Sequence, residues 1–232
     1  MRAVADRAPV EVSGDGGATL VSDRGERIAL AVDRWHTEAD AVERALLAAV
    51  PDPVLDIGCG PGRLVAALAA EGRMALGVDP SPAAIAAAAR RRAPALRRSV
   101  FDPLPGERRW GTVLLLDGNV GIGGDPVALL ARAASLLRPG GVVLAEVEPP
   151  GTETGGRTVR LESAAGAGPW FPWARVGADR FGDLARRAGL RVEPGVPGWT
   201  PRGGGSSAAR SDAGARVATR GGRRWFARAV RP

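Results

Sequence analysis

The chain has no lysine, one histidine and one cysteine among its 232 residues, and these shortages exclude several classes of protein. Because Cys59 has no second cysteine to pair with, no internal disulfide can form, which fits a reducing compartment. Residues 1–17 contain no apolar signal segment, and no run approaches the roughly 20 apolar residues of a membrane-spanning helix. The sequence therefore predicts a cytoplasmic protein that does not span a membrane.

Arginine carries all of the positive charge of the side chains. The 32 basic residues outnumber the 25 acidic ones and give a net charge of +7. A basic surface can attract an acidic partner such as nucleic acid. The arginines are scattered, however, and the densest group, at 89–98, lies where a predicted helix ends and cations complement the helix dipole. A solvated surface is the favoured interpretation, and nucleic-acid binding is the weaker one.

The hydrophobic pattern divides the chain in two. Residues 1–36 are polar and lack sustained periodicity, so we expect them to be loosely ordered, whereas 37–232 are predicted to form a single domain. A helix is expected from Thr37, because Thr37 and Asp40 form a Ser/Thr-x-x-acid cap. Short apolar runs then alternate with helical segments, which predicts an α/β fold with a parallel sheet between helices. The expected strands span 54–57, 74–79, 95–101, 112–117, 142–147, 190–196 and 223–230.

Two segments of the last third lack a clear periodic pattern. Residues 168–177 combine two tryptophans and a phenylalanine with prolines, which predicts a broken loop that either covers the core or lines a ligand pocket. Residues 197–222 are rich in glycine, serine and arginine and are too polar to form a core. We expect a long connection there, after a helix over 177–190.

The stretch VLDIGCGPGR, residues 54–63, places three glycines at alternate positions directly after an apolar strand. A strand that turns straight into a helix exposes the first amides of that helix, and glycines there let a ligand lie against the backbone. Gly58, Gly60 and Gly62 form a G-x-G-x-G pattern, and Arg63 stands where a dinucleotide-binding fingerprint needs its last glycine. The spacing therefore disfavours a dehydrogenase and favours another nucleoside-based cofactor.

Acidic residues follow the neighbouring strands. Asp79 lies 21 positions after Gly58 and ends the second strand, where a carboxylate can accept hydrogen bonds from both ribose hydroxyls. Asp102, beside Phe101, follows the third strand, and an acid next to an aromatic ring suits an adenine. Asp56 lies within the end of the first strand, where its charge is costly to desolvate unless a cationic or donor group meets it.

At these residues the sequence resembles the class I S-adenosylmethionine-dependent methyltransferases, over about 37–147. Asp56, Gly58, Gly60 and Gly62 match the acid-x-G-x-G-x-G loop of that family, and the bend at 136–141 is also typical. The resemblance implies a Rossmann-like three-layer α/β/α sandwich whose seven-stranded, mostly parallel sheet has the order 3-2-1-4-5-7-6, with strand seven antiparallel. It implies S-adenosylmethionine as cofactor and S-adenosylhomocysteine as product. The residues expected at the cofactor are Asp56, Gly58, Cys59, Gly60, Asp79, Pro80, Phe101, Asp102, Asp117 and Gly118.

Methyl transfer from a sulfonium is an in-line displacement that requires alignment and exclusion of water, and the sequence predicts no metal site. A general base helps only a weakly acidic acceptor. His36, the single histidine, lies at the entrance of the first helix and is either such a base or merely a residue at a helix start. Asn119, Glu146, Trp170, Trp173 and Arg175 are the candidate acceptor-side residues, and Arg175 would pair with an acidic acceptor.

The favoured function is methylation of an O, N or C atom of a small molecule, because we expect no added recognition domain beside the single predicted domain. Residues 117–126 also lack the Asn/Asp-Pro-Pro-aromatic motif of enzymes that methylate amino groups of nucleic acid. RNA or protein methylation is an alternative that the basic charge supports. A non-catalytic scaffold that binds the cofactor is a third. The sequence indicates neither the identity of the acceptor nor the oligomeric state.

Overall fold

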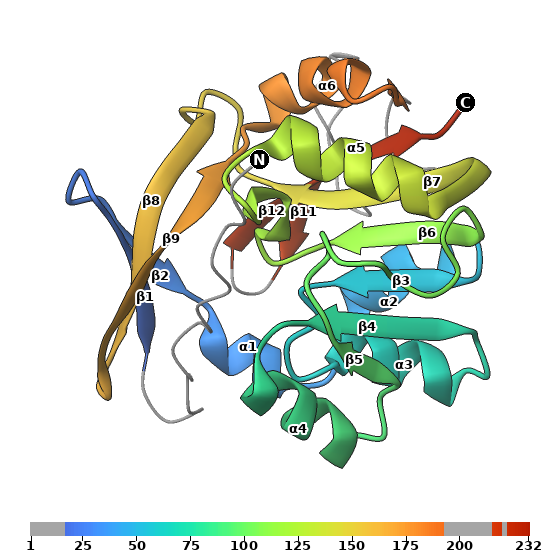
Figure 1. Ribbon diagram of the computed structural model, residues 1–232, viewed down its shortest axis with the longest axis horizontal. Helices are drawn as coiled ribbons and strands as arrows, with labels where there is room; N and C mark the ends of the chain where they lie inside the picture. Colours follow the sequence, from blue (N-terminus) through green and yellow to red (C-terminus); the bar gives the residue numbers. More distant parts are fainter. Residues whose placement is uncertain (1–16, 193–214, 220–221) are drawn as a thin grey trace.

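Two sheets meet in the structure, a computed structural model that describes residues 17–192, 215–219 and 222–232 (Figure 1). The larger sheet is parallel from β5 to β7, whereas β12 runs antiparallel to β7 and to β10. Its strands lie in the order β10 (Arg191–Val192), β12 (Gly222–Val230), β7 (Leu137–Val147), β6 (Trp110–Leu115), β3 (Val54–Ile57), β4 (Ala75–Asp79) and β5 (Ala95–Arg97). This order confirms the predicted arrangement 3-2-1-4-5-7-6 with an antiparallel seventh strand.

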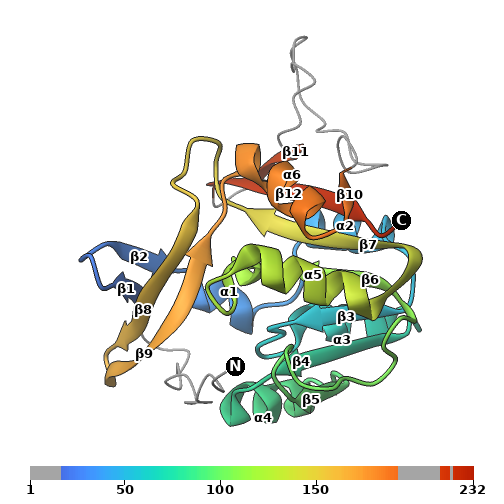
Figure 2. The same ribbon diagram turned by 45° about the horizontal axis from the view of Figure 1, so that its top comes forward.

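Helices cover both faces of the larger sheet, as the three-layer prediction requires (Figure 2). The helices are α2 (Ala41–Ala48), α3 (Arg63–Ala70), α4 (Pro82–Arg90), α5 (Pro126–Leu136) and α6 (Ala178–Arg187). Strand β6 shows why they form two layers: Val113 and Leu115 pack into the core under α5 and α6, whereas Leu114 packs into the core under α2 and α3. In the described part of the chain no helix is long and apolar enough to cross a membrane.

Helix α2 begins three residues later than predicted. Asp40, not Thr37, is its N-cap, and the Asp40 side chain accepts a hydrogen bond from the Glu43 N–H at 2.8 Å. The Glu43 carboxylate accepts in turn from the Asp40 N–H at 3.0 Å, which completes a capping box. The Thr37 hydroxyl instead donates to the Arg34 carbonyl and closes the short helix α1 (Val32–His36). The predicted cap was wrong because two overlapping cap patterns were present and the downstream one satisfies more backbone donors.

The smaller sheet departs most from the sequence-based expectations. Its antiparallel strands lie in the order β2 (Arg27–Leu30), β1 (Ala18–Ser22), β8 (Gly155–Ser163) and β9 (Gly166–Arg175). Residues 18–22 and 27–30, expected to be loosely ordered, are strands because β1 pairs with both β2 and β8 and Leu20 packs beside Leu161 in a shared core. Residues 168–175 are a strand and not a loop, because β9 lies at a sheet edge, where Pro172 is tolerated.

The predicted connection over 197–222 falls mostly outside the described residues. Within it, β11 (Ala215–Thr219) is described and pairs with β12, while 197–214 and 220–221 are not. The carboxyl ends of the parallel strands point toward the smaller sheet and α1 (Figure 1). The candidate site therefore lies where the two sheets meet.

Candidate functional site

The glycine turn after β3 is built for close approach of a ligand to the backbone. Gly58, Gly60 and Gly62 have φ values of +70°, +52° and +75°, in the left-handed region that side chains disfavour. A Cβ at Gly58 would lie 2.7 Å from the amide nitrogen of Asn119. A Cβ at Gly60 would have no described neighbour within 4 Å. The turn is thus tightly packed at Gly58 and open at Gly60.

Asp79 lies at the end of β4 and faces this turn. One carboxylate oxygen accepts from the Gly60 N–H at 3.0 Å, and the other accepts from the Ser81 N–H at 2.8 Å. Burial raises the pKa of Asp79, although both amide donors oppose that rise. Each oxygen keeps a further lone pair, so the carboxylate can also accept from a hydroxyl of a bound ribose. The structure thus places Asp79, followed by Pro80, beside the open part of the turn.

Asp56 is buried, with 3% of its surface exposed, and its side chain makes no hydrogen bond or ion pair with the side chains or backbone of the described residues. Burial raises the pKa of its carboxyl from 3.8 to about 7, opposed by the charge of Arg63 and assisted by Asp79 and Glu43. A buried carboxylate of this kind is stabilised by a cationic or hydrogen-bond-donating ligand. Together with the open backbone at Gly60, it fits a nucleoside cofactor that carries positive charge.

The other residues expected at the cofactor lie around the same edge of the sheet. Phe101 is 50% exposed, and its ring lies against the turn at Gly123, where a Cβ would come within 2.9 Å of it. The exposed Asp102 carboxylate accepts from the Ser99 N–H at 3.0 Å. Cys59 packs against Gly77 of β4, and burial raises the pKa of its thiol, so it is not a thiolate nucleophile. Contacts of Phe101 and Asp102 with an adenine stay predictions.

A cluster of buried and half-buried charges joins the glycine turn to the elements around it. Its members come from α1, α2, α3, the turn after β6, β7 and β12, and their guanidinium and carboxylate charges balance. The cluster consists of Arg34, Glu43, Arg63, Asp117, Glu146 and Arg224. Six elements are therefore tied together at one point beside the turn.

Arg63 begins α3, where the helix dipole disfavours a positive charge. Two ion pairs compensate: its guanidinium binds the Glu43 carboxylate and lies 2.6 Å from an Asp117 oxygen. Burial alone would raise the pKa of Glu43, but Arg63 and Arg224 outweigh it and the pKa is lowered. Glu43 is therefore ionised inside the core, between two guanidinium groups.

Arg224 completes the cluster from β12. It binds Glu146 in a bidentate manner, with its Nε 2.8 Å from one oxygen and a terminal nitrogen 2.7 Å from the other. The Glu146 carboxylate also accepts from the Asp117 N–H at 2.9 Å. Asp117 has a φ of +56°, a conformation that non-glycine residues rarely adopt. The contacts with Arg34, Arg63 and Glu146 hold it there.

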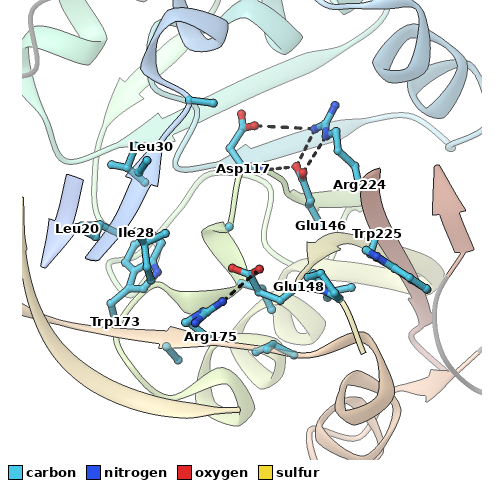
Figure 3. A pocket seen from close by; sticks show the side chains of 18 of the residues that line it. Leu20, Ile28, Leu30, Asp117, Glu146, Glu148, Trp173, Arg175, Arg224 and Trp225 are labelled. Carbon is cyan, nitrogen blue, oxygen red and sulfur yellow. Dashed lines mark hydrogen bonds and ion pairs between the residues drawn. The ribbon is translucent and has the colours of Figure 1, made fainter. Parts of the chain in front are cut away.

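A cavity of about 260 Å³ separates this cluster from the smaller sheet (Figure 3). Side chains of β1, β2 and β9 form one wall, and the turn after β6 together with the end of β7 forms the other. The apolar lining includes Leu20, Ile28, Leu30, Trp35, Val120, Trp173 and Trp225, and the charged lining consists of Arg34, Asp117, Glu146, Glu148, Arg175 and Arg224. Asp117 and Gly118 line the cavity, and the adjacent Asn119 donates to the glycine turn, so the turn after β6 connects the two regions.

The cavity brings together some of the residues predicted for the acceptor side. Glu146, Trp173 and Arg175 line it. Asn119 instead donates from its amide to the carbonyls of Ile57 and Gly58, at 2.8 and 2.9 Å, and so fixes the glycine turn. Trp170 is 46% exposed and stacks under Arg160, 4.9 Å from its ring centroid.

The predicted base, His36, is not brought to the cavity. Its side chain is exposed at the end of α1, and it is not among the lining residues. Its backbone carbonyl accepts a hydrogen bond from Arg91, so α1 is also attached to the residue that follows α4. The two residues before it, Arg34 and Trp35, do face the cavity. The position of His36 therefore does not support a role in proton transfer.

Sequence reasoning missed the basic half of the cluster and the wall formed by the smaller sheet. Arg34, Arg63 and Arg224 look like ordinary surface arginines, and no local pattern indicates that they converge. One signal was present: Glu43 and Arg63 interrupt helix faces that are otherwise apolar. A buried charge in such a face requires a partner of opposite sign.

Comparisons with known proteins agree with this geometry. A family model described as a methyltransferase domain matches residues 29–194. A search among curated proteins found no match. A methyltransferase from Bacteroides fragilis, solved with S-adenosylhomocysteine, has a TM-score of 0.67 at 18% identity, covering 93% of this chain and 88% of that one.

Two further structures share the fold. The Burkholderia thailandensis 1,6-didemethyltoxoflavin-N1-methyltransferase has a TM-score of 0.54 at 23% identity, covering 86% of this chain and 81% of that one. The sugar N-methyltransferase KedS8 from a Streptoalloteichus species has a TM-score of 0.54 at 22% identity, covering 85% and 87%. At these identities the likeness shows the fold, whereas the family match covers most of the chain. The chain therefore belongs to the class I S-adenosylmethionine-dependent methyltransferases.

Proposed function

We propose that this methyltransferase acts on a small molecule held in the cavity between the two sheets and methylates an O, N or C atom of it. The observation that carries the proposal is the position of the cavity. Its one wall is the Asp117–Gly118 turn at the cofactor edge, and its opposite wall is the apolar surface of the smaller sheet. A volume of about 260 Å³ suits a compact acceptor, and aromatic walls of this kind are typical of small-molecule sites.

On the cofactor side, the residues present suit S-adenosylmethionine. When bound, the cofactor supplies a methyl group that is already activated on a sulfonium. We assign Gly60 to backbone contact, Asp79 to the ribose hydroxyls and Asp56 to the positively charged end, because it is the buried carboxylate that has no other described partner. Phe101 and Asp102 are assigned to the adenine.

On the acceptor side, the protein aligns the acceptor and excludes water, since in-line displacement depends mainly on orientation. Trp35, Trp173 and Trp225 contribute flat apolar surface to the walls. Glu146 is fully engaged by Arg224 and by the Asp117 amide, so it serves to position the turn. Glu148 lies at the end of β7, and Arg175, 3.5 Å away, is its described ion-pair partner. The Glu148 carboxylate is therefore better placed than His36 to accept a proton from an acceptor.

The printed names of structural neighbours support a small acceptor. They include methyltransferases of 1,6-didemethyltoxoflavin, of a sugar and of magnesium protoporphyrin IX. These acceptors differ widely in size and polarity, so they support the class of acceptor and not its identity. The lining of this chain's own cavity decides what it admits.

Isothermal titration calorimetry tests the cofactor assignment. S-adenosylmethionine and S-adenosylhomocysteine are expected to bind saturably to the native chain, and NAD is not. Replacing Asp79 by Ala should weaken both ligands about tenfold or more, since charge-assisted hydrogen bonds are lost. Asp183→Ala is the matched control, because that carboxylate is exposed on α6 and pairs with Arg186. Equal affinities for Asp79→Ala and the native chain would contradict the assignment of Asp79.

A methyl-transfer assay then tests the acceptor class. Radiolabelled S-adenosylmethionine is offered together with pooled small molecules or with total RNA. We expect label in the small molecules and none in RNA. Salt-dependent binding of RNA accompanied by methylation of it would overturn the small-molecule proposal and favour the basic surface as a recognition site.

A further inference from the structure

Two arginines of the cavity lining each carry a buried side-chain nitrogen that has no hydrogen-bond partner among the described residues. Among the described residues, four buried side-chain atoms lack one, and two of these are the Nε atoms of Arg34 and Arg175, both in the cavity lining. The other two belong to Glu26 and Arg157, which form an ion pair with each other and do not line the cavity. A buried N–H without an acceptor is costly, so the two arginines point to a ligand that brings acceptor atoms.

Arg175 is the more available of the two. Arg34 is bound to Asp117, and burial lowers its pKa. The Arg175 guanidinium makes no hydrogen bond to the described residues, and its single ion pair reaches Glu148 at 3.5 Å, too long for a strong hydrogen bond. Figure 3 shows Arg175 and Glu148 side by side in the cavity, apart from the group around Arg224.

The remaining charges of the lining do not compete for Arg175. Asp117 and Glu146 form ion pairs with Arg34, Arg63 and Arg224. Among the residues that line the cavity, the negative charges of Asp117 and Glu146 are therefore balanced by the positive charges of Arg34 and Arg224. The Glu148 side chain is 38% exposed and the Arg175 side chain 25%, so water screens the carboxylate somewhat more than the guanidinium. A cationic acceptor would find Glu148 already next to a guanidinium, whereas an anionic one finds unused donors.

We propose that the acceptor is a flat, largely apolar acid whose carboxylate binds the guanidinium of Arg175. This inference rests on the proposed function and specifies the substrate class of the same cavity. The planar fork of a guanidinium matches both oxygens of a carboxylate, which a lysine ammonium does not. Trp173, Trp225 and Ile28 supply the flat apolar surface for the remainder of the molecule. The carboxylate replaces Glu148 as the closest partner of Arg175.

Binding of three matched probes tests this class. The probes are 2-naphthoate, its neutral amide 2-naphthamide, and the cationic 2-(aminomethyl)naphthalene. Each is titrated into protein saturated with S-adenosylhomocysteine, with tryptophan fluorescence as the readout, because tryptophans line the cavity. We expect 2-naphthoate to bind about tenfold more tightly than the amide, and the cation to bind most weakly.

Substitutions locate the source of that preference. Arg175→Gln should lower the affinity for 2-naphthoate about tenfold and change the affinity for the amide by no more than about twofold. The affinity of Arg175→Lys for 2-naphthoate should lie between those of the native chain and Arg175→Gln. Glu148→Gln should tighten 2-naphthoate, since a competing carboxylate is removed. Arg160→Gln is the matched control: Arg160 lies on β8 in the same small sheet, stacked on Trp170 and outside the cavity lining.

Several results would overturn the inference. It is overturned if the amide or the cation binds as tightly as the acid, if Arg175→Gln weakens all three probes equally, or if protein loaded with S-adenosylhomocysteine does not bind the acid. The affinity for S-adenosylhomocysteine is measured in every sample. If the native chain does not bind S-adenosylhomocysteine, the proposed function is contradicted. If it binds S-adenosylhomocysteine but does not prefer the acid to the amide, only this inference is contradicted.

Discussion

A buried carboxylate without a hydrogen-bond partner is unfavourable in its charged form, and Asp56 is such a residue at the end of β3. Its neighbours are charged as well: Arg63 favours the ionised form, while Asp79 and Glu43 disfavour it. Burial dominates, and the pKa rises to about 7. Ionisation of Asp56 is therefore unfavourable in the folded protein, at a position where a cationic ligand would stabilise the charge.

This raised pKa makes a prediction about stability and pH. Between about pH 4 and pH 7 the folded state binds more protons at Asp56 than the unfolded state does, so the free energy of unfolding falls as pH rises through this window. Asp56→Asn removes that fall. We expect the stabilisation by this substitution to be roughly 2–3 kcal/mol greater at pH 8 than at pH 5, measured by urea unfolding of both proteins.

The control for this experiment is Asp183→Asn, an exposed carboxylate on α6. Its effect on the free energy of unfolding should be nearly the same at both pH values. If Asp56→Asn also gave the same change at pH 5 and pH 8, the carboxyl would titrate at an ordinary pKa and would not be held in an apolar environment.

At the scale of single residues, the sequence predicted the residues whose role depends on a local motif. Asp56 and Asp79 end strands and Gly58 and Gly60 follow one, so all four lie at the carboxyl edge of the sheet, and their contacts with the cofactor stay predictions. Arg34, by contrast, reaches Asp117 across 83 positions of the chain. No local spacing encodes a contact of that kind, so the charge cluster had to be seen in the structure.

At the scale of elements, the turn from Gly118 to Gly124 joins the two sheets. A Cβ at Gly121 would clash with the carbonyl of Ala174 and lie 2.8 Å from the Trp173 Nε1. Ile122 and Trp173 also form an isolated β-bridge. The turn after β6 is therefore in direct backbone contact with β9, which carries Trp173 and Arg175 into the cavity.

Gly121→Ala tests this contact. The added methyl cannot be accommodated without moving β9, so we expect the free energy of unfolding to fall by about 1–3 kcal/mol, as overpacking does elsewhere. The affinity for S-adenosylhomocysteine should change by less than about twofold, because the substitution does not alter the glycine turn after β3. A twofold change in affinity corresponds to a free-energy difference well below about 1.4 kcal/mol. Urea unfolding and calorimetry provide the two measurements.

Gly17→Ala is the matched control, because a Cβ there meets no described atom within 4 Å and the residue does not have a positive φ. It should leave both quantities unchanged. A Gly121→Ala protein as stable as the native chain would show that β9 is free to shift, and the turn would then not determine the position of the cavity wall.

The elements of the larger sheet were predictable and those of the smaller sheet were not, for a physical reason. β3, β6 and residues 142–147 of β7 are short, mostly apolar runs because both of their faces are buried. β8 buries one face only, so Val159 and Leu161 alternate with polar residues and the segment looks like a polar loop. In β9 the pattern is further obscured by Pro172, which an edge strand accepts.

At the scale of the whole molecule, the two sheets have separate hydrophobic cores. Leu161 packs with Leu20 and Val159 in the core of the smaller sheet, whereas Leu130 of α5 packs in the core of the larger one. Strands β1 and β8, which build the smaller sheet, are more than 130 positions apart in the chain, as the pairing of Thr19 with Glu162 shows. The cavity wall formed by the smaller sheet thus depends on a long-range strand pairing. The edge of the larger sheet that carries the glycine turn and Asp79 depends instead on elements that are consecutive in the chain.

This arrangement predicts that the two sheets differ in how they open. Leu161→Ala removes buried apolar volume, which costs about 2–5 kcal/mol in well-packed cores. We expect it to accelerate amide hydrogen exchange in β1, β2 and β8 while exchange in β3 and β6 stays slow, measured by mass spectrometry. Affinity for S-adenosylhomocysteine should persist, because Leu161 touches neither the glycine turn nor Asp79.

Leu130→Ala is the matched comparison, because it removes the same side-chain volume from the core of the larger sheet. Leu130 is buried in the core shared by α5, β6 and β7, so its loss should accelerate exchange in the larger sheet, and in the smaller sheet that rests on it. If Leu161→Ala accelerated exchange equally in β3 and β6, the two sheets would unfold as one cooperative unit. The asymmetry between the two variants would instead show that the smaller sheet, which forms one wall of the cavity, can open while the larger sheet and its glycine turn remain folded.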